Sequence, residues 1–226
     1  GAVVAILFST RQYGIIVGAG IGALVSFLLL MLLLRHSAAD ATKVVLTGVL
    51  IGFLFQALTS LVVTASGNAE STRGIMFWLL GVLGAARWHT LAAVIVVGTI
   101  GMVLMWILSR YLDALSLGSA TVSTMGVPVV ALRYTVLIAV SLMTAVTVAS
   151  VGAIGFVGLI VPHAVRMLNT PRHSSLIPLS ALVGAITLVV ADAIGRVLFA
   201  PQELPVGVIT ALIGVPMFFF ILQRKH

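Results

Sequence analysis

Long apolar runs separated by short polar stretches set the pattern of this sequence. A membrane-spanning helix needs about 20 mainly apolar residues, and seven runs reach or approach that length: residues 14–34, 44–65, 89–109, 134–151, 153–168, 175–198 and 206–223. Two of them, 134–151 and 153–168, are shorter and flank a turn expected at Gly152, and residues 1–9 look like the end of a further helix. The pattern predicts an all-α polytopic membrane protein with about seven full transmembrane helices and a partial one.

Residues 70–87 interrupt the apolar runs with an amphipathic segment that is too short to span a membrane. Trp78 lies within it and Trp88 directly follows it, and indole rings favour the headgroup region of a bilayer. We therefore expect an interfacial helix here instead of another span.

The longest polar interruption covers residues 111–133, where Gly118, Gly126 and Pro128 divide the segment into two short helical pieces. An ordinary surface loop is one interpretation. The segment is unusually apolar for a free loop, through Leu115, Leu117, Val122, Met125, Val127, Val129, Val130 and Leu132. A compact amphipathic knob at the membrane surface suits docking into a groove on a soluble partner.

Composition excludes a soluble globular protein and predicts a chain surrounded by membrane lipid. Hydrophobic residues make up 61% and charged residues 8% of the 226 positions, against about 25% charged residues in soluble domains. The absence of cysteine excludes disulfides and thiolate metal sites. The net charge of +7 comes from basic residues scattered singly between apolar runs, so it indicates membrane topology and no nucleic-acid partner.

The placement of lysine and arginine predicts the orientation of the helices. If successive helix ends alternate between the two sides, one side holds eight basic residues: Arg35, Lys43, Arg110, Arg133, Arg166, Arg172, Arg224 and Lys225. The other side holds four: Arg11, Arg73, Arg87 and Arg196. The richer side is expected to face the cytoplasm, which places 111–133, 166–174 and the C-terminus inside and 66–88 and 196–206 outside.

The glycine-rich apolar run of residues 152–166 ends with Pro162, His163 and Arg166. A proline, an imidazole and a guanidinium are energetically unfavourable in hydrocarbon. Pro162 removes a backbone donor and kinks or ends a helix. His163 and Arg166 are three residues apart and share a helix face, where we expect them to line a cytoplasmic mouth or to brace the 111–133 segment. A proton relay or a metal ligand is the alternative. A lone histidine without Cys, Asp or Glu at ligand spacing supports a metal site only weakly, so we expect neither a metal nor a cofactor.

Asp192 and Arg196 are four residues apart at the outer end of a span, within reach of each other on one helix. An aspartate in a membrane should have a partner, so an internal ion pair is one expectation. The other is that Arg196 is exposed on the outer rim and contacts a soluble protein there, and both can hold.

Three stretches carry a family resemblance: residues 152–166, which read GAIGFVGLIVPHAVR, and residues 191–207 and 211–218. They resemble the permease subunits of bacterial ABC importers for iron-siderophores, haem and cobalamin, the FecCD-type family. The resemblance implies one transmembrane domain over residues 1–226, within a permease fold of about ten helices in the bacterial inner membrane. Because the chain starts without methionine inside an apolar run, we expect it to be the C-terminal part of a longer protein, without the first two helices and most of a third.

The same resemblance implies roles for individual residues. The 111–133 segment corresponds to cytoplasmic coupling helices that sit on an ATPase subunit, with contacts expected from Leu117, Gly118, Met125, Gly126, Val127 and Pro128. The cytoplasmic mouth would involve Ala41, Thr42, Pro162, His163 and Arg166. Contacts to an extracytoplasmic substrate-binding protein would come from Arg196 and Glu203. Ser119 and Ala120 depart from the family, which commonly has acidic residues there, and this departure weakens any prediction of a charge pair with the ATPase.

The expected function is ATP-driven import of a ferric siderophore or a similar metal chelate, with this chain forming the translocation path. No Gly-x-x-x-x-Gly-Lys-Ser/Thr phosphate loop occurs. ATP hydrolysis is therefore expected from two ATP-binding partner subunits, and the chain itself is not expected to be an enzyme. The resemblance also implies a second permease copy or paralogue.

Two other classes of function compete with this expectation. An ATP-independent secondary transporter or channel is the alternative, although it would be expected to place several charged groups in mid-membrane. An intramembrane enzyme is disfavoured, because the five histidines lie near span ends and form no constellation with a nucleophile or metal ligands.

Overall fold

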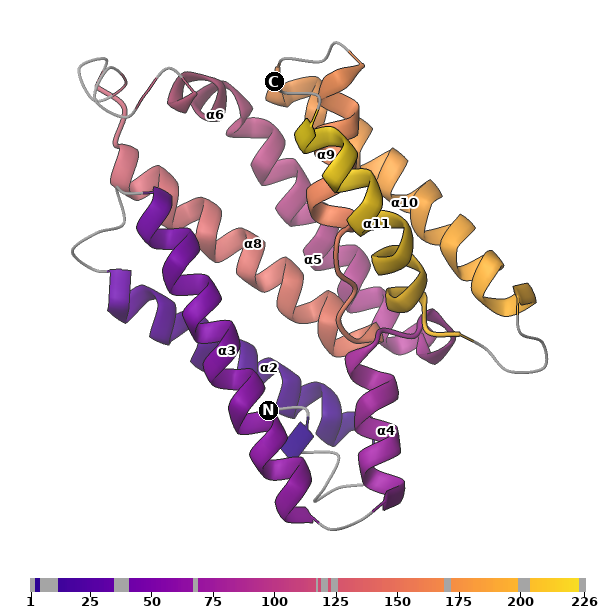
Figure 1. Cartoon of the computed structure of the whole chain (residues 1–226). Helices are drawn as coiled ribbons and strands as arrows, with labels where there is room; N and C mark the ends of the chain where they lie inside the picture. Colours follow the sequence, from indigo (N-terminus) through magenta and orange to yellow (C-terminus); the bar gives the residue numbers. More distant parts are fainter. Residues whose placement is uncertain are drawn as a thin grey trace.

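The computed structural model describes residues 3–4, 12–34, 41–66, 69–116, 118, 122, 126–168, 172–198 and 204–223. Helices form along the apolar runs because hydrocarbon offers no hydrogen-bond partner, and a helix satisfies its backbone groups internally. They are α2 (Gln12–Leu34), α3 (Ala41–Ser66), α4 (Ala69–Leu79), the 3-10 helix η1 (Leu83–Ala85), α5 (Trp88–Ile107), α6 (Ser109–Leu115), α8 (Val129–Val151), α9 (Val157–Met167), α10 (His173–Leu198) and α11 (Val206–Gln223) (Figure 1). The all-helical architecture predicted from hydropathy is confirmed for the described part of the chain.

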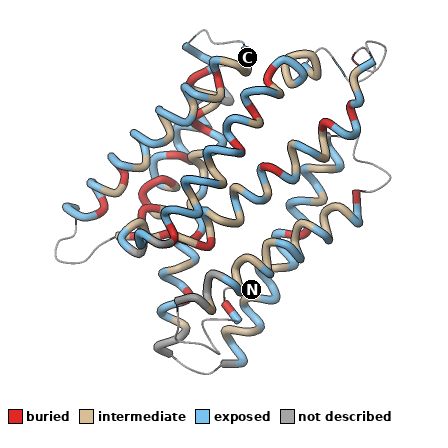
Figure 2. Tube along the Cα trace, turned by 180° about the vertical axis from the view of Figure 1, so that it is seen from behind, coloured by how far each residue is buried: buried red, intermediate tan, exposed pale blue. Residues whose placement is uncertain are grey.

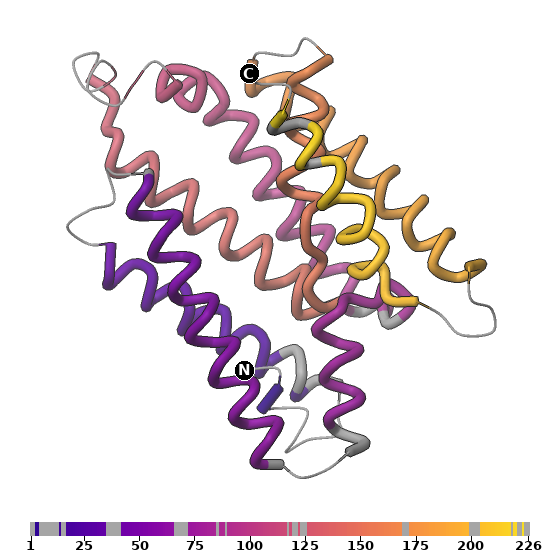
Figure 3. The backbone as a smooth tube through the Cα atoms, in the orientation of Figure 1, coloured from indigo at the N-terminus to yellow at the C-terminus, as the bar shows by residue number. Residues whose placement is uncertain are grey.

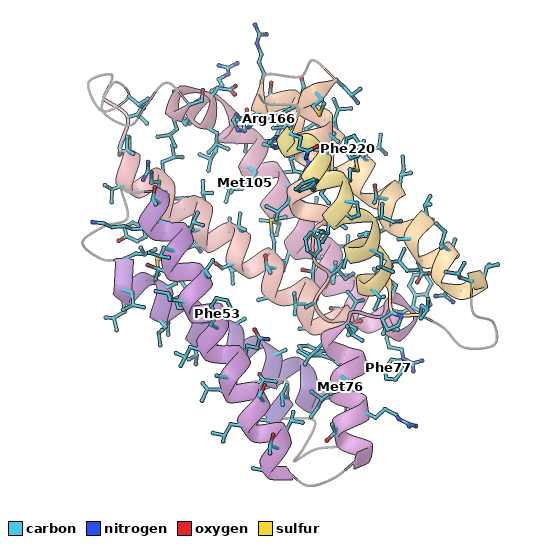
Figure 4. All side chains as sticks on the ribbon, viewed as in Figure 1. Phe53, Met76, Phe77, Met105, Arg166 and Phe220 are labelled. Atoms are coloured by element: carbon cyan, nitrogen blue, oxygen red, sulfur yellow. The ribbon has the colours of Figure 1, made fainter. Side chains whose placement is uncertain are left out.

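Five of the described helices are long and apolar enough to cross a membrane, namely α2, α3, α5, α8 and α10, while α9 and α11 contain shorter apolar helices. These seven helices lie where seven spans were predicted, and five of them have the length of a span. Only 6–17% of the residues in the long spans are buried within the chain, and exposed positions run along the outer sides of the helices in Figure 2. Large side chains such as Phe53 and Phe220 are exposed on the bundle (Figure 4). The helices therefore present apolar faces to lipid or to other membrane helices.

Two span boundaries differ from the predicted ones. α8 begins at Val129, ahead of the expected residue 134, and its 23 residues make it a full span. The expected span over 153–168 is wrong, because residues 152–156 are not helical and the 11 residues of α9 extend only about 16 Å, against roughly 30 Å for a hydrocarbon core. Gly152 ends α8 with φ 81° and ψ −175°, and Phe156 precedes α9 with φ 66°. No continuous helix passes through these conformations, and α9 begins part-way along the bundle (Figure 1).

The amphipathic segment at 70–87 folds as two elements instead of one helix. α4 and η1 are separated by a turn in which Gly81 has φ 72°, a conformation that glycine adopts without steric cost. The backbone N–H of Val82 donates to the carbonyl oxygen of Val151 at 2.8 Å. The break after α4 therefore ties this segment to the end of α8.

Three glycines bring together the end of α4, the 152–156 segment and the start of α11 through their backbones (Figure 3). A Cβ at Gly81 would lie 2.6 Å from a backbone oxygen of the 152–156 segment. One at Gly152 would collide with the carbonyl oxygen of Trp78 in α4, and one at Gly207 with a carbonyl oxygen just after α4. Small residues allow such close backbone approach between membrane segments. We refer to Gly81, Gly152 and Gly207 as the glycine junction.

Figure 1 shows which helix ends gather together. α6, the start of α8, the end of α9 and the start of α10 lie toward one end of the bundle, and α4, η1 and the start of α11 lie toward the other. The first group carries Arg110, Arg133, Arg166 and Arg172, four of the eight basic residues assigned to the richer side. We refer to this end as the cytoplasmic end, as the positive-inside pattern predicts.

Candidate functional site

Three side chains from three helices form a chain of contacts at the cytoplasmic end: Arg166 in α9, His173 at the start of α10 and Asp113 in α6. Nη2 of Arg166 lies 3.1 Å from Nε2 of His173. Nδ1 of His173 lies 2.6 Å from Oδ1 of Asp113, and the backbone N–H of His173 donates to the same oxygen at 2.9 Å. Arg166 is labelled at this end of the bundle in Figure 4. We refer to the three residues as the Arg–His–Asp cluster.

Donor chemistry assigns the tautomer of His173 in this cluster. A guanidinium only donates hydrogen bonds, so Nε2 of His173 accepts and the ring proton lies on Nδ1, which donates to Asp113. Partial burial raises the pKa of Asp113, but the backbone and ring hydrogen bonds from His173, with the positive charge of Arg172, lower it more, so this pKa lies below its usual value. The carboxylate contact is therefore present at neutral pH and is lost only as the pH falls through that lowered pKa.

A second contact joins α5 to the same turn of α10. Nε1 of Trp106 donates to the carbonyl oxygen of Ser174 at 3.1 Å. Four residues further along α10 stands Pro178, which has no N–H to offer this oxygen. The indole N–H takes the place of the missing helical donor. As a result, α5, α6, α9 and α10 are all connected at their cytoplasmic ends.

The Arg–His–Asp cluster links the start of the 111–133 segment to α9 and α10, because Asp113 belongs to both that segment and α6. Sequence reasoning singled out Arg166 and missed Asp113 and His173. One usable signal was the scarcity of acidic residues, five in 226, since a carboxylate near a membrane needs a partner. The separation of 60 residues between the two partners hid the pairing.

The other residues expected at the cytoplasmic mouth are placed without joining the cluster. Pro162 lies inside α9 and does not end it, and His163 is partly buried beside it with no hydrogen bond from its ring to the described residues. Ala41 begins α3, and Thr42 is exposed on the first turn of that helix. The start of α3 lies apart from the end of α9 in Figure 1. Among the described residues, no group of three His, Cys, Asp or Glu is arranged to hold a metal ion.

The middle of the 111–133 segment is described at three positions that shape it. Gly118 and Gly126 have φ of 103° and 78°, in the left-handed region that favours glycine. Val122 lies between them and is fully buried. At this described position the segment therefore packs against the chain.

The end of this segment differs from the expectation. Residues 129–133 belong to α8, because the helix begins directly after Pro128, whose ring fixes φ at −74°. Val127 is partly buried and Pro128 is exposed. Leu117 and Met125 lie outside the described residues.

At the opposite end of the bundle, Asp192 and Arg196 form an ion pair within α10. Nε of Arg196 donates to Oδ2 of Asp192 at 2.8 Å. The side chain of Arg196 is 47% exposed. Glu203 lies outside the described residues.

Comparison with known proteins identifies relatives along almost the whole chain. The chain matches the FecCD transport family over residues 1–224. It is 39% identical to the cobalamin import system permease protein BtuC of Halobacterium salinarum, across 100% of this chain and 61% of that protein. It is 36% identical to the Fe(3+) dicitrate transport system permease protein FecD of Escherichia coli, across 88% of this chain and 62% of that protein.

A solved structure gives the same result. It is described as an inward-facing metal-chelate type ABC transporter, and it superposes with a TM-score of 0.89 at 33% identity, over 99% of this chain and 71% of that one. The chain spans about three fifths of the length of the two curated relatives. The predicted family and the multi-pass membrane architecture are therefore confirmed, and the chain belongs to the FecCD transport family.

Proposed function

We propose that this chain is the transmembrane permease part of an ATP-driven importer and forms the translocation path for a ferric siderophore or a similar metal chelate. The observation that carries the proposal is the family match over residues 1–224. The named relatives support it, because one imports cobalamin and the other ferric dicitrate. Both cargoes are metal ions held in an organic ligand, and this is the cargo class we assign to the path.

The chain acts in this proposal as one transmembrane domain that is driven from outside. Two ATP-binding subunits contact the 111–133 segment, and ATP-dependent closure of those subunits displaces it. The Arg–His–Asp cluster supports this role, since it joins α6 to α9 and α10 through contacts of 2.6 and 3.1 Å. A second permease copy or paralogue covers part of the exposed apolar surface, and a substrate-binding protein docks at the opposite end.

Uptake into proteoliposomes tests this function. The complete permease is reconstituted with its ATPase subunits and substrate-binding protein, and radiolabelled ferric siderophore or cobalamin is offered outside. We expect accumulation only when ATP is supplied to the ATPase side, with none from a proton or sodium gradient alone. Uptake that follows an ion gradient without ATP would replace the proposal by a secondary transporter.

Arg196→Glu is expected to weaken docking of the substrate-binding protein by about tenfold, because a rim charge of this kind attracts a complementary surface. The loss should be larger at low salt, where exposed charge pairs are least screened. Binding is measured by surface plasmon resonance on the reconstituted importer at two salt concentrations.

Asp192→Asn is the matched control for this variant. It breaks the same 2.8 Å ion pair but keeps the arginine. The affinity for the substrate-binding protein should therefore stay within about twofold of the wild type, as expected for a surface substitution. If both variants weaken docking equally, the ion pair acts through the shape of α10, and Arg196 has no docking role.

A further inference from the structure

A pocket of about 640 Å³ opens at the cytoplasmic end between α5, α6 and the start of α10. Its lining includes two arginines, Arg110 of α6 and Arg172 before α10, and also Trp106 and Ile107 of α5. The pocket therefore has a basic part beside an apolar part.

The basic part has charge left over for a ligand. Arg110 and Arg172 are exposed, and the guanidinium group of neither makes a hydrogen bond or ion pair with another residue of the described chain. Asp113 also lines the pocket, and its Oδ1 accepts hydrogen bonds from the backbone and ring of His173. Arg172 acts on Asp113 through its charge, without an ion pair between the two side chains. Two arginines and one aspartate therefore leave this wall with a net positive charge.

The apolar part of the pocket faces the predicted bilayer. Trp106 and Ile107 end the apolar span of α5, with 55% and 60% of their surfaces exposed. The indole N–H of Trp106 is occupied by Ser174, so the ring offers its apolar faces. Tryptophan at the end of a span marks the membrane–water boundary, so the pocket crosses from headgroup depth into hydrocarbon.

We propose that this pocket binds an anionic phospholipid of the cytoplasmic leaflet, with its phosphate between Arg110 and Arg172 and an acyl chain along Trp106 and Ile107. Basic pockets between transmembrane helices on this side suit phosphate headgroups. A free phosphate ion would use the arginines and leave the apolar wall unexplained. An acidic side chain of a docked protein would leave the same wall uncovered.

Native mass spectrometry of the intact importer complex in non-ionic detergent tests the proposal. Phosphatidylglycerol and phosphatidylcholine with identical acyl chains are titrated separately. The wild type should bind phosphatidylglycerol at least tenfold more tightly (roughly fivefold per arginine). Arg110→Gln combined with Arg172→Gln should weaken phosphatidylglycerol binding by about thirtyfold and remove the preference.

Two further variants control for charge and folding. Arg73→Gln with Arg87→Gln removes two exposed arginines at the other end and should keep the preference. Arg110→Lys with Arg172→Lys keeps the charge and should also keep it.

Three results would overturn the proposal. They are unchanged phosphatidylglycerol affinity in the double glutamine variant, displacement of the lipid by inorganic phosphate at equal concentration, and loss of a partner subunit from that variant with lipid binding intact. The second result would indicate a simple anion site, and the third a contact with an acidic protein surface.

Discussion

Replacing Gly152 by alanine is expected to leave little folded permease in the membrane. Gly152 combines φ 81° with ψ −175°, a backbone region that is essentially restricted to glycine and costs other residues roughly 1–3 kcal/mol. The added Cβ would also collide with the carbonyl oxygen of Trp78, and a backbone atom cannot move aside as a flexible side chain can. We expect the free energy of unfolding to fall by about 3 kcal/mol or more, measured as a lower thermal midpoint and a lower yield of monodisperse protein.

Gly155→Ala is the matched control in the same non-helical segment. A Cβ at Gly155 meets no atom within 4 Å, and this glycine is not among those with positive φ. The control should therefore express and unfold like the wild type, whereas Gly207→Ala should share the defect of Gly152→Ala. Equal stability of the Gly152 and Gly155 variants would show that the glycine junction does not hold the fold together.

The junction matters for function because of where α9 begins and ends. The helix starts just after the 152–156 segment, which packs through Gly152 against α4. Toward its other end, Arg166 contacts His173 and through it Asp113. α9 is thus fixed to backbone at one end and to the Arg–His–Asp cluster at the other. A displacement of α6 can therefore be transmitted through these side-chain contacts to α9 and to the middle of the bundle.

Replacing Val127 by aspartate is expected to separate the permease from its ATPase subunits. This prediction depends on the proposed coupling role of the 111–133 segment. Val127 is partly buried between Gly126 and Pro128, and a carboxylate there would enter the contact surface without a cationic partner. An unpaired charge in an interface costs several kcal/mol, so the affinity for the ATPase should fall by about a hundredfold or more. The readout is the amount of ATPase recovered with affinity-tagged permease.

Ala86→Asp is the matched control, since it adds the same charge at an exposed position between η1 and α5, at the opposite end of the bundle. ATPase recovery with this variant should equal that of the wild type, and both variants should retain the wild-type thermal midpoint. If Val127→Asp retains its ATPase while folding normally, the segment is an ordinary surface loop.

Hydropathy predicted the helices well because the bilayer imposes a simple rule, in which about 20 apolar residues form one span. The turn at Gly152 was also predictable, since a glycine between two apolar runs is a common break. The length of α9, the helix after this turn, was not predictable. Phe156 has φ 66°, and this conformation depends on tertiary packing that a local sequence pattern does not indicate. For the same reason the sequence suggested a span where α9 is a half-length helix.

The Arg–His–Asp cluster was predictable only in part. Arg166 was noticeable because a charged side chain at the end of an apolar run, close to hydrocarbon, is energetically costly. Its link to Asp113 through His173 required knowing that α6 and α10 meet, and this depends on the tertiary fold. The glycine junction was hidden similarly, since Gly81, Gly152 and Gly207 are three of 22 glycines and only the backbone contacts distinguish them.

Affinity purification of the complete permease from its host membranes, in mild detergent and followed by mass spectrometry, tests the central claim most directly. The proposed importer predicts that a P-loop ATPase is recovered in stoichiometric amount, and that a substrate-binding protein joins it when a ferric siderophore or cobalamin is added. Recovery of a stable permease with no ATPase would contradict the claim and would favour an ATP-independent transporter.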